Sequence, residues 1–315
     1  IADDAPGGAP RAELWTRRAA ARWLPARPQA GHKGSFGHVL VIAGSEGKAG
    51  AAALAGLGAA RMGAGLVTIA CPRGSHAALQ ATLREAMTAP VAPTDAFGAE
   101  SEKPVLELAA ARDVAVLGPG IGRSEATRGF VRRVVPALPT PLVLDADGLF
   151  AFGDAIAELG AREQPTVLTP HPGEAALLLG STPAEVNRDR PAAARRLAAE
   201  SGAHVVLKGA ATVIADPSGA IVVNPTGGPL LATGGTGDVL AGAIGGLLAQ
   251  GLGPREAAAL GVFVHGAAAD ALTAARGPAG VLAGEVAGAL PDALLRLGEP
   301  HASPSGDRLA FPEPR

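Results

Sequence analysis

The chain has 315 residues, of which 48% are hydrophobic and 18% charged, and its formal net charge is −2. This composition excludes global disorder, and the absence of clustered lysines and arginines argues against a nucleic-acid surface. Cys71 is the sole cysteine, so no disulfide and no cysteine-rich metal site forms within the chain, which suits a reducing, cytoplasmic compartment.

The two ends differ in composition from the rest of the chain. Residues 1–30 read as a linker, or as the end of an upstream domain, with one short helix over 13–24 between proline-rich stretches. Residues 299–315 contain four prolines and little apolar periodicity, which predicts a flexible tail. We therefore expect a single folded domain over 31–298.

Within that domain, continuous apolar runs alternate with alanine-rich helical patterns. The predicted strands are 38–43, 66–70, 114–117, 142–144, 167–168 and 204–207, with helices over 49–62 and 124–135 between them. A hairpin of 212–215 and 220–223 follows, and the chain is helical from Gly237 to Gly277 with a break at 251–253. Unbroken apolar strands separated by helices predict an α/β fold, a mostly parallel sheet with helices on both faces.

The most apolar stretch, residues 51–70, is interrupted by Arg61 and by several glycines. It reads as a buried helix followed by a strand rather than as a membrane span. We therefore expect no membrane partner.

Polar residues or glycines follow each strand, namely Gly44, 118–120, Asp145, His171 and Lys208. Ligands bind outside the carboxyl ends of the strands in such sheets, so these residues are expected at one edge. Lys208, one of only four lysines, suits a phosphate contact, although a solvated surface lysine is the simpler alternative. No Walker A loop accompanies it.

The strongest local signal is the run 234–238, Gly-Gly-Thr-Gly-Asp, which leads into an amphipathic helix. Backbone N–H groups of Gly235, Thr236 and Gly237 at a helix start would form an anion hole. Asp238 beside it could accept a proton from an attacking hydroxyl. The alternative is an ordinary glycine-rich turn with an acidic cap.

Two further loops are less specific. The run 118–122, Gly-Pro-Gly-Ile-Gly, suggests a dinucleotide fingerprint, but it is not in the first βα unit and lacks the third glycine. In the rigid loop 169–174, His171 lies between two prolines and Glu174 begins a helix, so the histidine is either structural or functional. No second ligand stands at metal-binding spacing, so we expect no metal held by the protein alone.

Taken together, these motifs resemble the ribokinase-like NAD(P)H-hydrate dehydratases over about residues 31–297. The resemblance is carried by the segments 32–37, 43–45, 50–52, 118–120, 145–149, 169–174, 206–209, 224–227 and 234–238. It departs from the family pattern at Gly228, where asparagine is usual, and at Leu231, where methionine is frequent. These differences concern the detail of one loop.

The resemblance implies dehydration of hydrated NADH or NADPH, driven by ADP or ATP with Mg²⁺, through phosphorylation of the ring hydroxyl and elimination of phosphate. It implies that Asp238 is the base. It assigns the nucleotide to Lys208, Gly209, Ala210, Ala211, Thr212 and Gly237, and the hydrated dinucleotide to Ala52, Gly120, His171 and Asp238. It also implies a homo-oligomer. The resemblance also implies that an epimerase domain can precede this one in the same chain, and the start at Ile1 with a Pro/Gly-rich segment leads to the hypothesis of such a fused upstream domain.

Two other functions use the same residues. A small-molecule kinase of the same superfamily, acting on a thiazole or pyrimidine alcohol, would share Asp238 and the anion hole without needing the His171 loop. A non-catalytic nucleotide sensor would keep Lys208 but would not need Asp238. The sequence does not distinguish ADP from ATP.

Overall fold

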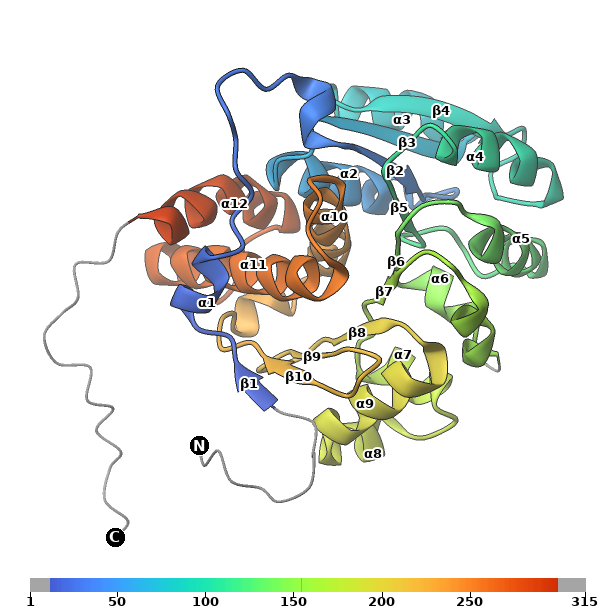
Figure 1. Cartoon of the computed structure of the whole chain (residues 1–315). Coiled ribbons are helices and arrows are strands. Elements are labelled where there is room, and N and C mark those ends of the chain that lie inside the picture. Colours follow the sequence, from blue (N-terminus) through green and yellow to red (C-terminus); the bar gives the residue numbers. More distant parts are fainter. Residues whose placement is uncertain (1–11, 154, 300–315) are drawn as a thin grey trace, which may run out of the picture.

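The strands form one ten-stranded sheet in the order β1-β10-β9-β8-β7-β6-β5-β2-β3-β4, in a computed structural model that describes residues 12–153 and 155–299 (Figure 1). Neighbouring strands are parallel except where β9 pairs with β8 and with β10; the pairing of β9 with β10 is the predicted hairpin. The expectation of a mostly parallel α/β sheet is confirmed.

The strands are β1 (Ala12–Leu14), β2 (His38–Ile42), β3 (Leu66–Pro72), β4 (Met87–Ala92), β5 (Val114–Leu117), β6 (Leu142–Leu144), β7 (Thr166–Leu168), β8 (His204–Leu207), β9 (Val213–Ala215) and β10 (Ile221–Val223). The α-helices are α1 (Arg17–Ala21), α2 (Ala49–Arg61), α3 (Arg73–Thr82), α4 (Glu102–Ala109), α5 (Glu125–Ala137), α6 (Asp147–Phe150), α7 (Pro172–Leu178), α8 (Pro183–Arg188), α9 (Arg190–Ser201), α10 (Thr236–Ala249), α11 (Pro254–Arg276) and α12 (Ala283–Gly298). Short 3₁₀ helices are η1 (Lys33–Phe36), η2 (Ala99–Ser101), η3 (Ile156–Ala161) and η4 (Pro229–Leu231).

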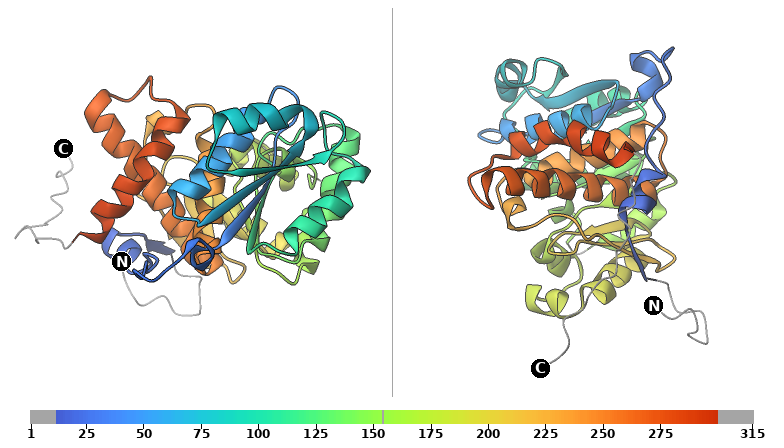
Figure 2. Two further views of the ribbon diagram at one scale, coloured as in Figure 1. Left: turned by 90° about the horizontal axis from the view of Figure 1, so that it is seen from above. Right: turned by 90° about the vertical axis from the view of Figure 1, so that its left-hand side faces the viewer.

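Strand β2 shows why the central strands are mostly apolar on both faces. Val39 and Val41 face the core shared with α2, α10, α11 and α12, whereas Leu40 and Ile42 face the core shared with α4, α5, α7 and α9. Helices cover both faces of the sheet in Figure 2. Side chains alternate along a strand, so both sets must be apolar when both faces are buried.

The segment before β2 differs from its prediction. The helix expected over 13–24 is shorter, because Thr16 accepts a hydrogen bond from the Ala19 N–H and thereby sets the start of α1 at Arg17. Glu13 and Leu14 belong instead to β1, which pairs with β10 at the sheet edge. Trp15 is 2% exposed, so this part of the predicted linker packs against the domain. The predicted tail from 300 onward lies outside the described residues.

Helices α2 and α10 meet along their backbones. A Cβ atom at Gly58 would stand 2.2 Å from the Val239 carbonyl oxygen, and one at Gly242 would stand 1.8 Å from the Ala55 oxygen. Only glycine permits this approach. The contact fixes α10, whose first turn carries the predicted anion hole, beside the strand ends.

Helix α11 is long and apolar enough to cross a membrane by length and composition. Its most apolar window is 72% buried inside the fold, as expected of a core helix. The stretch 51–70 is α2 followed by β3, as its glycines and Arg61 predicted.

Candidate active site

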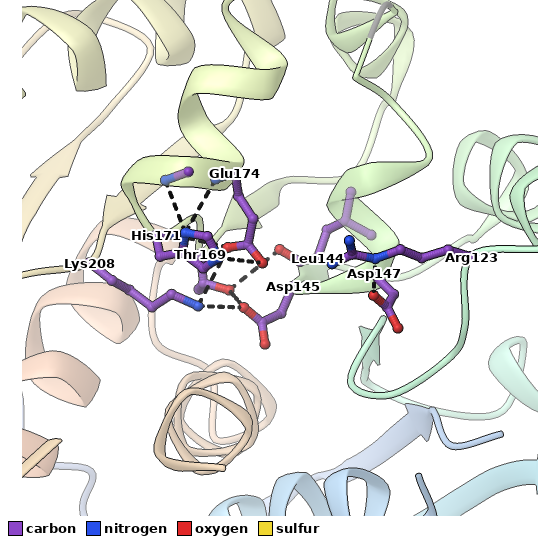
Figure 3. Close-up of polar contacts among 9 residues, drawn as sticks. Arg123, Leu144, Asp145, Asp147, Thr169, His171, Glu174 and Lys208 are labelled. Carbon is purple, nitrogen blue, oxygen red and sulfur yellow. Dashed lines mark hydrogen bonds and ion pairs between the residues drawn. The ribbon is translucent and has the colours of Figure 1, made fainter. Parts of the chain in front are cut away.

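The ends of β6, β7 and β8 bring together a buried ion pair. Asp145, 1% exposed, accepts hydrogen bonds on Oδ1 from Lys208 Nζ at 3.0 Å and from Thr169 Oγ1 at 2.6 Å (Figure 3). Burial opposes the charge on Lys208, but the carboxylates of Asp145 and Glu174 outweigh it, so the pKa of Lys208 lies above its usual value. Lys208 is therefore a fixed cation at the carboxyl ends of the strands, not a solvated surface residue.

The loop after β7 is held by a reciprocal cap at the start of α7. His171 Nδ1 accepts from the N–H groups of Gly173 and Glu174 at 3.0 and 3.3 Å, while the His171 N–H donates to Glu174 Oε2 at 2.8 Å. The same Glu174 oxygen lies 3.8 Å from Lys208 Nζ. His171 thus has a structural role, and its side chain remains 57% exposed at the rim. Glu174 was not among the predicted site residues.

The glycine run turns into α10 as predicted. Gly235 has φ +92°, a conformation that glycine adopts without strain. One of the three predicted anion-hole donors is already engaged, because the Thr236 N–H donates to the Thr233 carbonyl at 3.3 Å. The first-turn N–H groups of Gly237 and Asp238 have no acceptor within the helix and remain available to an anion.

Asp238 is the titratable group of this turn. Burial above all, together with the negative charges of Asp145, Asp147 and Glu174, raises its pKa to about 7, although the positive charge of Lys208 lowers it. A carboxyl group with a pKa near neutrality exchanges a proton readily at physiological pH, which suits a general base.

A cavity of about 370 Å³ opens beside Lys208. Five of the predicted nucleotide-binding residues line it, namely Lys208, Gly209, Ala210, Thr212 and Gly237; Ala211 does not. A Cβ atom at Gly237 would stand 3.4 Å from Lys208 Nζ, so glycine leaves the space between the cation and the helix start clear. Gly228 and Leu231, the two departures from the family pattern, also line the cavity.

Arg190, at the start of α9, binds the backbone of the predicted nucleotide loop. Its Nη2 donates to the carbonyls of Leu207 at 3.0 Å and Ala211 at 3.4 Å, and Nη1 donates to that of Ala210. Ala211 has φ +52°, unusual for a residue with a side chain, and the guanidinium holds that turn. No sequence motif indicates this role, because the guanidinium binds carbonyls 17 to 21 residues further along the chain.

A second polar cluster surrounds Asp147, within electrostatic range of Asp238. Asp147, 9% exposed, pairs through Oδ2 with Lys48 Nζ at 3.0 Å and through Oδ1 with Arg123 Nε at 2.5 Å. Burial raises the pKa of Asp147, but the hydrogen bonds from Arg123 and Lys48 lower it below its usual value. A Cβ atom at Gly120 would approach Lys48 Cβ within 2.9 Å. Gly120 therefore adjoins Lys48, one of the two half-exposed cations of this cluster.

Of the predicted substrate residues, Gly120, His171 and Asp238 are at least partly exposed to solvent near the carboxyl ends of the strands. Ala52 is fully buried, and its methyl group lies beneath Gly44. It could shape the site only through packing.

Across residues 12–153 and 155–299, no three His, Cys, Asp or Glu side chains converge as metal ligands.

Comparison with known proteins identifies the family of this site. Residues 39–292 match the Carb_kinase family model, described as NAD(P)H-hydrate dehydratase. The chain is 45% identical over 278 residues to the bifunctional NAD(P)H-hydrate repair enzyme Nnr of Moorella thermoacetica, covering 88% of this chain and 52% of that protein. The chain thus spans about half the length of the bifunctional relatives that it matches.

A shorter relative is covered almost throughout. The ADP-dependent (S)-NAD(P)H-hydrate dehydratase of Neisseria meningitidis is 41% identical, over 83% of this chain and 86% of that protein. Among solved structures, an ADP/ATP-dependent NAD(P)H-hydrate dehydratase from Bacillus subtilis, co-crystallized with ATP/Mg²⁺, superposes with a TM-score of 0.80 at 34% identity. It covers 90% of this chain and 98% of that one.

Proposed function

The chain belongs to the NAD(P)H-hydrate dehydratase family, and on that premise we propose that it repairs hydrated NADH or NADPH by an ADP- or ATP-dependent dehydration. The observation that carries the proposal is one juxtaposition. Lys208 and the start of α10 adjoin a nucleotide-sized cavity. Asp238, in the same first turn and with its pKa raised to about 7, lies within electrostatic range of both Lys208 and Asp147.

The proposed chemistry follows from this arrangement. Asp238 takes the proton of the substrate ring hydroxyl, whose oxygen then bonds to the terminal phosphorus of the nucleotide. The bond from that phosphorus to its bridging oxygen breaks, and the shortened nucleotide leaves with the electron pair. Phosphate then departs from the ring carbon as the adjacent carbon loses a proton, which restores the reduced nicotinamide.

Each group of this chain has a defined task in that sequence. The Lys208 ammonium and the N–H groups of Gly237 and Asp238 stabilise the charge that develops on the transferred phosphoryl group. Lys208 stays charged because Asp145 and Glu174 raise its pKa. Mg²⁺ bound with the nucleotide would supply further charge neutralisation, held mainly by the phosphates.

The direct test incubates the protein with hydrated NADH, Mg²⁺ and either ADP or ATP, and follows recovery of the reduced-nicotinamide absorbance. Recovery with one or both nucleotides supports the proposal and reveals the preferred one. No recovery with either would overturn it. A small-alcohol kinase would give no recovery under these conditions and would release a phosphorylated alcohol when supplied with that alcohol.

A matched pair of variants tests the role of Asp238. Asp238→Ala should abolish turnover and retain most nucleotide affinity, whereas Glu163→Ala, which removes an exposed carboxylate elsewhere, should change neither. Activity retained in Asp238→Ala would make the base assignment wrong.

The wider setting of the protein remains proposed. We propose a cytoplasmic location and a homo-oligomeric assembly, whose mass light scattering can measure. The upstream epimerase domain stays a prediction, which sequencing of the full reading frame tests.

A further inference from the structure

Two cations near Gly120 take no part in the chemistry above. Lys48 stands in the loop after β2, and Arg123 stands in the loop after β5. These strands are parallel neighbours at which the strand order reverses, since β3 and β4 lie beyond β2 whereas β6, β7 and β8 lie beyond β5. The following helices, α2 and α5, pack on opposite faces of the sheet. Open parallel sheets bind ligands outside the carboxyl ends of the strands at such a reversal.

Asp147, directly after β6, holds both cations at this point. Its carboxylate accepts hydrogen bonds from Arg123 Nε at 2.5 Å (Figure 3), from Lys48 Nζ at 3.0 Å and from the Gly122 N–H at 3.1 Å. The Asp147 side chain is 9% exposed, whereas those of Lys48 and Arg123 are 48% and 55% exposed. One cation would neutralise the carboxylate, so the second leaves a net positive charge on the exposed side of the group.

The donors that remain suit a phosphate group. Arg123 donates to Asp147 through Nε alone, and its two Nη nitrogens have no hydrogen-bond partner within residues 12–153 and 155–299. Its guanidinium carbon lies 4.7 Å from the centroid of the Phe150 ring, and this stacking restricts the plane of the guanidinium. Two neighbouring guanidinium nitrogens bind phosphate oxygens in a bidentate way, and the Lys48 ammonium adds a point charge beside them.

The position of these cations separates them from the phosphates of the nucleotide. Neither residue lines the cavity beside Lys208. A Cβ atom at Gly120, a predicted substrate residue, would instead stand 2.9 Å from both the Cβ and the carbonyl oxygen of Lys48. The charge of Asp147 also acts on Asp238, so the cluster and the proposed base share one site. Hydrated NADH and NADPH both carry a diphosphate, and NADPH a further 2′-phosphate, so the substrate itself supplies an anion for the two cations.

We propose that Lys48 and Arg123, positioned by Asp147, bind a phosphate group of the hydrated dinucleotide. The inference rests on the proposed function in taking that dinucleotide as the substrate. It makes the two cations determinants of substrate affinity and gives them no part in phosphoryl transfer.

The experiment measures binding by isothermal titration calorimetry on wild type, Lys48→Met, Arg123→Gln and Lys103→Met. The control, Lys103, has a side chain that is 87% exposed on α4. Hydrated NADH and hydrated NADPH are titrated without nucleotide, so that no turnover occurs, and ADP with Mg²⁺ is titrated separately. Each site variant should bind hydrated NADPH about tenfold more weakly and ADP less than about twofold more weakly. Lys103→Met should change neither affinity.

The two dinucleotides identify the phosphate that is bound. A comparable loss with hydrated NADH assigns the contact to the diphosphate that both share, whereas a loss confined to hydrated NADPH assigns it to the 2′-phosphate. An ionic contact also weakens as salt concentration rises, so wild-type binding should depend on salt more steeply than binding by the double variant. A purely structural role would leave that dependence unchanged.

Unchanged affinity for both hydrated dinucleotides in the two site variants overturns the proposal, as does a wild type that binds neither dinucleotide. Equal weakening of ADP, or an equal salt dependence in wild type and double variant, overturns it as well. Thermal unfolding measures any loss of folded protein, which would affect all ligands alike. The expected losses in a protein that shows no dehydration with ADP or ATP would refute the proposed function alone.

Discussion

Acidification from about pH 8 to about pH 6 should remove most of the dehydratase activity, because Asp238 must lose its proton to act as a base. With a pKa of about 7, its ionised fraction falls from about 90% to about 10% over this range. A carboxyl group at the ordinary value of 3.8 would stay almost fully ionised. The predicted loss is therefore about tenfold.

Asp145→Asn provides the internal control for this assignment. It removes a negative charge that raises the Asp238 pKa and releases Lys208, whose positive charge lowers it. Both effects move the acid limb to lower pH, by about one unit. The measurement is kcat/KM for hydrated NADH between about pH 5.5 and pH 9 at saturating nucleotide.

The terminal phosphate of the nucleotide titrates in a similar range, so a direct titration is also required. Carboxyl ¹³C NMR of the nucleotide-free protein should show a group titrating near pH 7 that is missing from Asp238→Asn. A flat activity profile between about pH 6 and pH 8, or a limb that Asp145→Asn leaves in place, would refute this account.

Three further outcomes concern stability and nucleotide binding. Asp238→Asn should raise the unfolding free energy at about pH 8 by about 1–2 kcal/mol and leave it unchanged near pH 4. The reason is that a carboxyl group whose pKa is raised in the folded protein loses its stabilising contribution as the pH rises through the folded pKa. Urea titrations at both pH values measure this difference, and an equal effect at both values is incompatible with it. Lys208→Met should lower the unfolding free energy by about 3 kcal/mol, because it leaves the buried Asp145 carboxylate without its ion-pair partner, and it should weaken ADP binding. Adding Asp145→Asn in the same chain should restore part of the stability but not the affinity. Gly235→Ala should lower the melting temperature and turnover because it forces a side chain into φ +92°, whereas Gly234→Ala, with nothing within 4 Å of the added Cβ, should change the melting temperature little.

The fold was predictable where burial shapes the sequence. Residues 39–42 of β2 are all apolar because both faces of the sheet are covered, and the hairpin carries its own turn signal. The two strands that were missed, β1 and β4, lie at the sheet edges. Strand β1 has only three residues, all exposed, and β4 contains Pro90, so neither shows a buried-strand pattern.

The site was predictable where chemistry follows a strand directly. Asp145 and Lys208 stand immediately after β6 and β8, and Asp238 stands in the glycine run. Arg190 was missed because its role depends on contacts with carbonyls 17 to 21 residues further along the chain, which no local motif indicates.

The glycine contact between α2 and α10 means that the backbone of α2 sets the position of the anion hole at the start of α10. Because Val239 lies against Gly58 and Gly242 against Ala55, with no intervening side chains, neither helix can adjust by changing rotamers. A methyl group at either glycine would push the whole of α10 outward and carry Gly237 away from Lys208. The alignment of cation and helix start is therefore sensitive to mutations on the far side of α10, at positions that no ligand would touch.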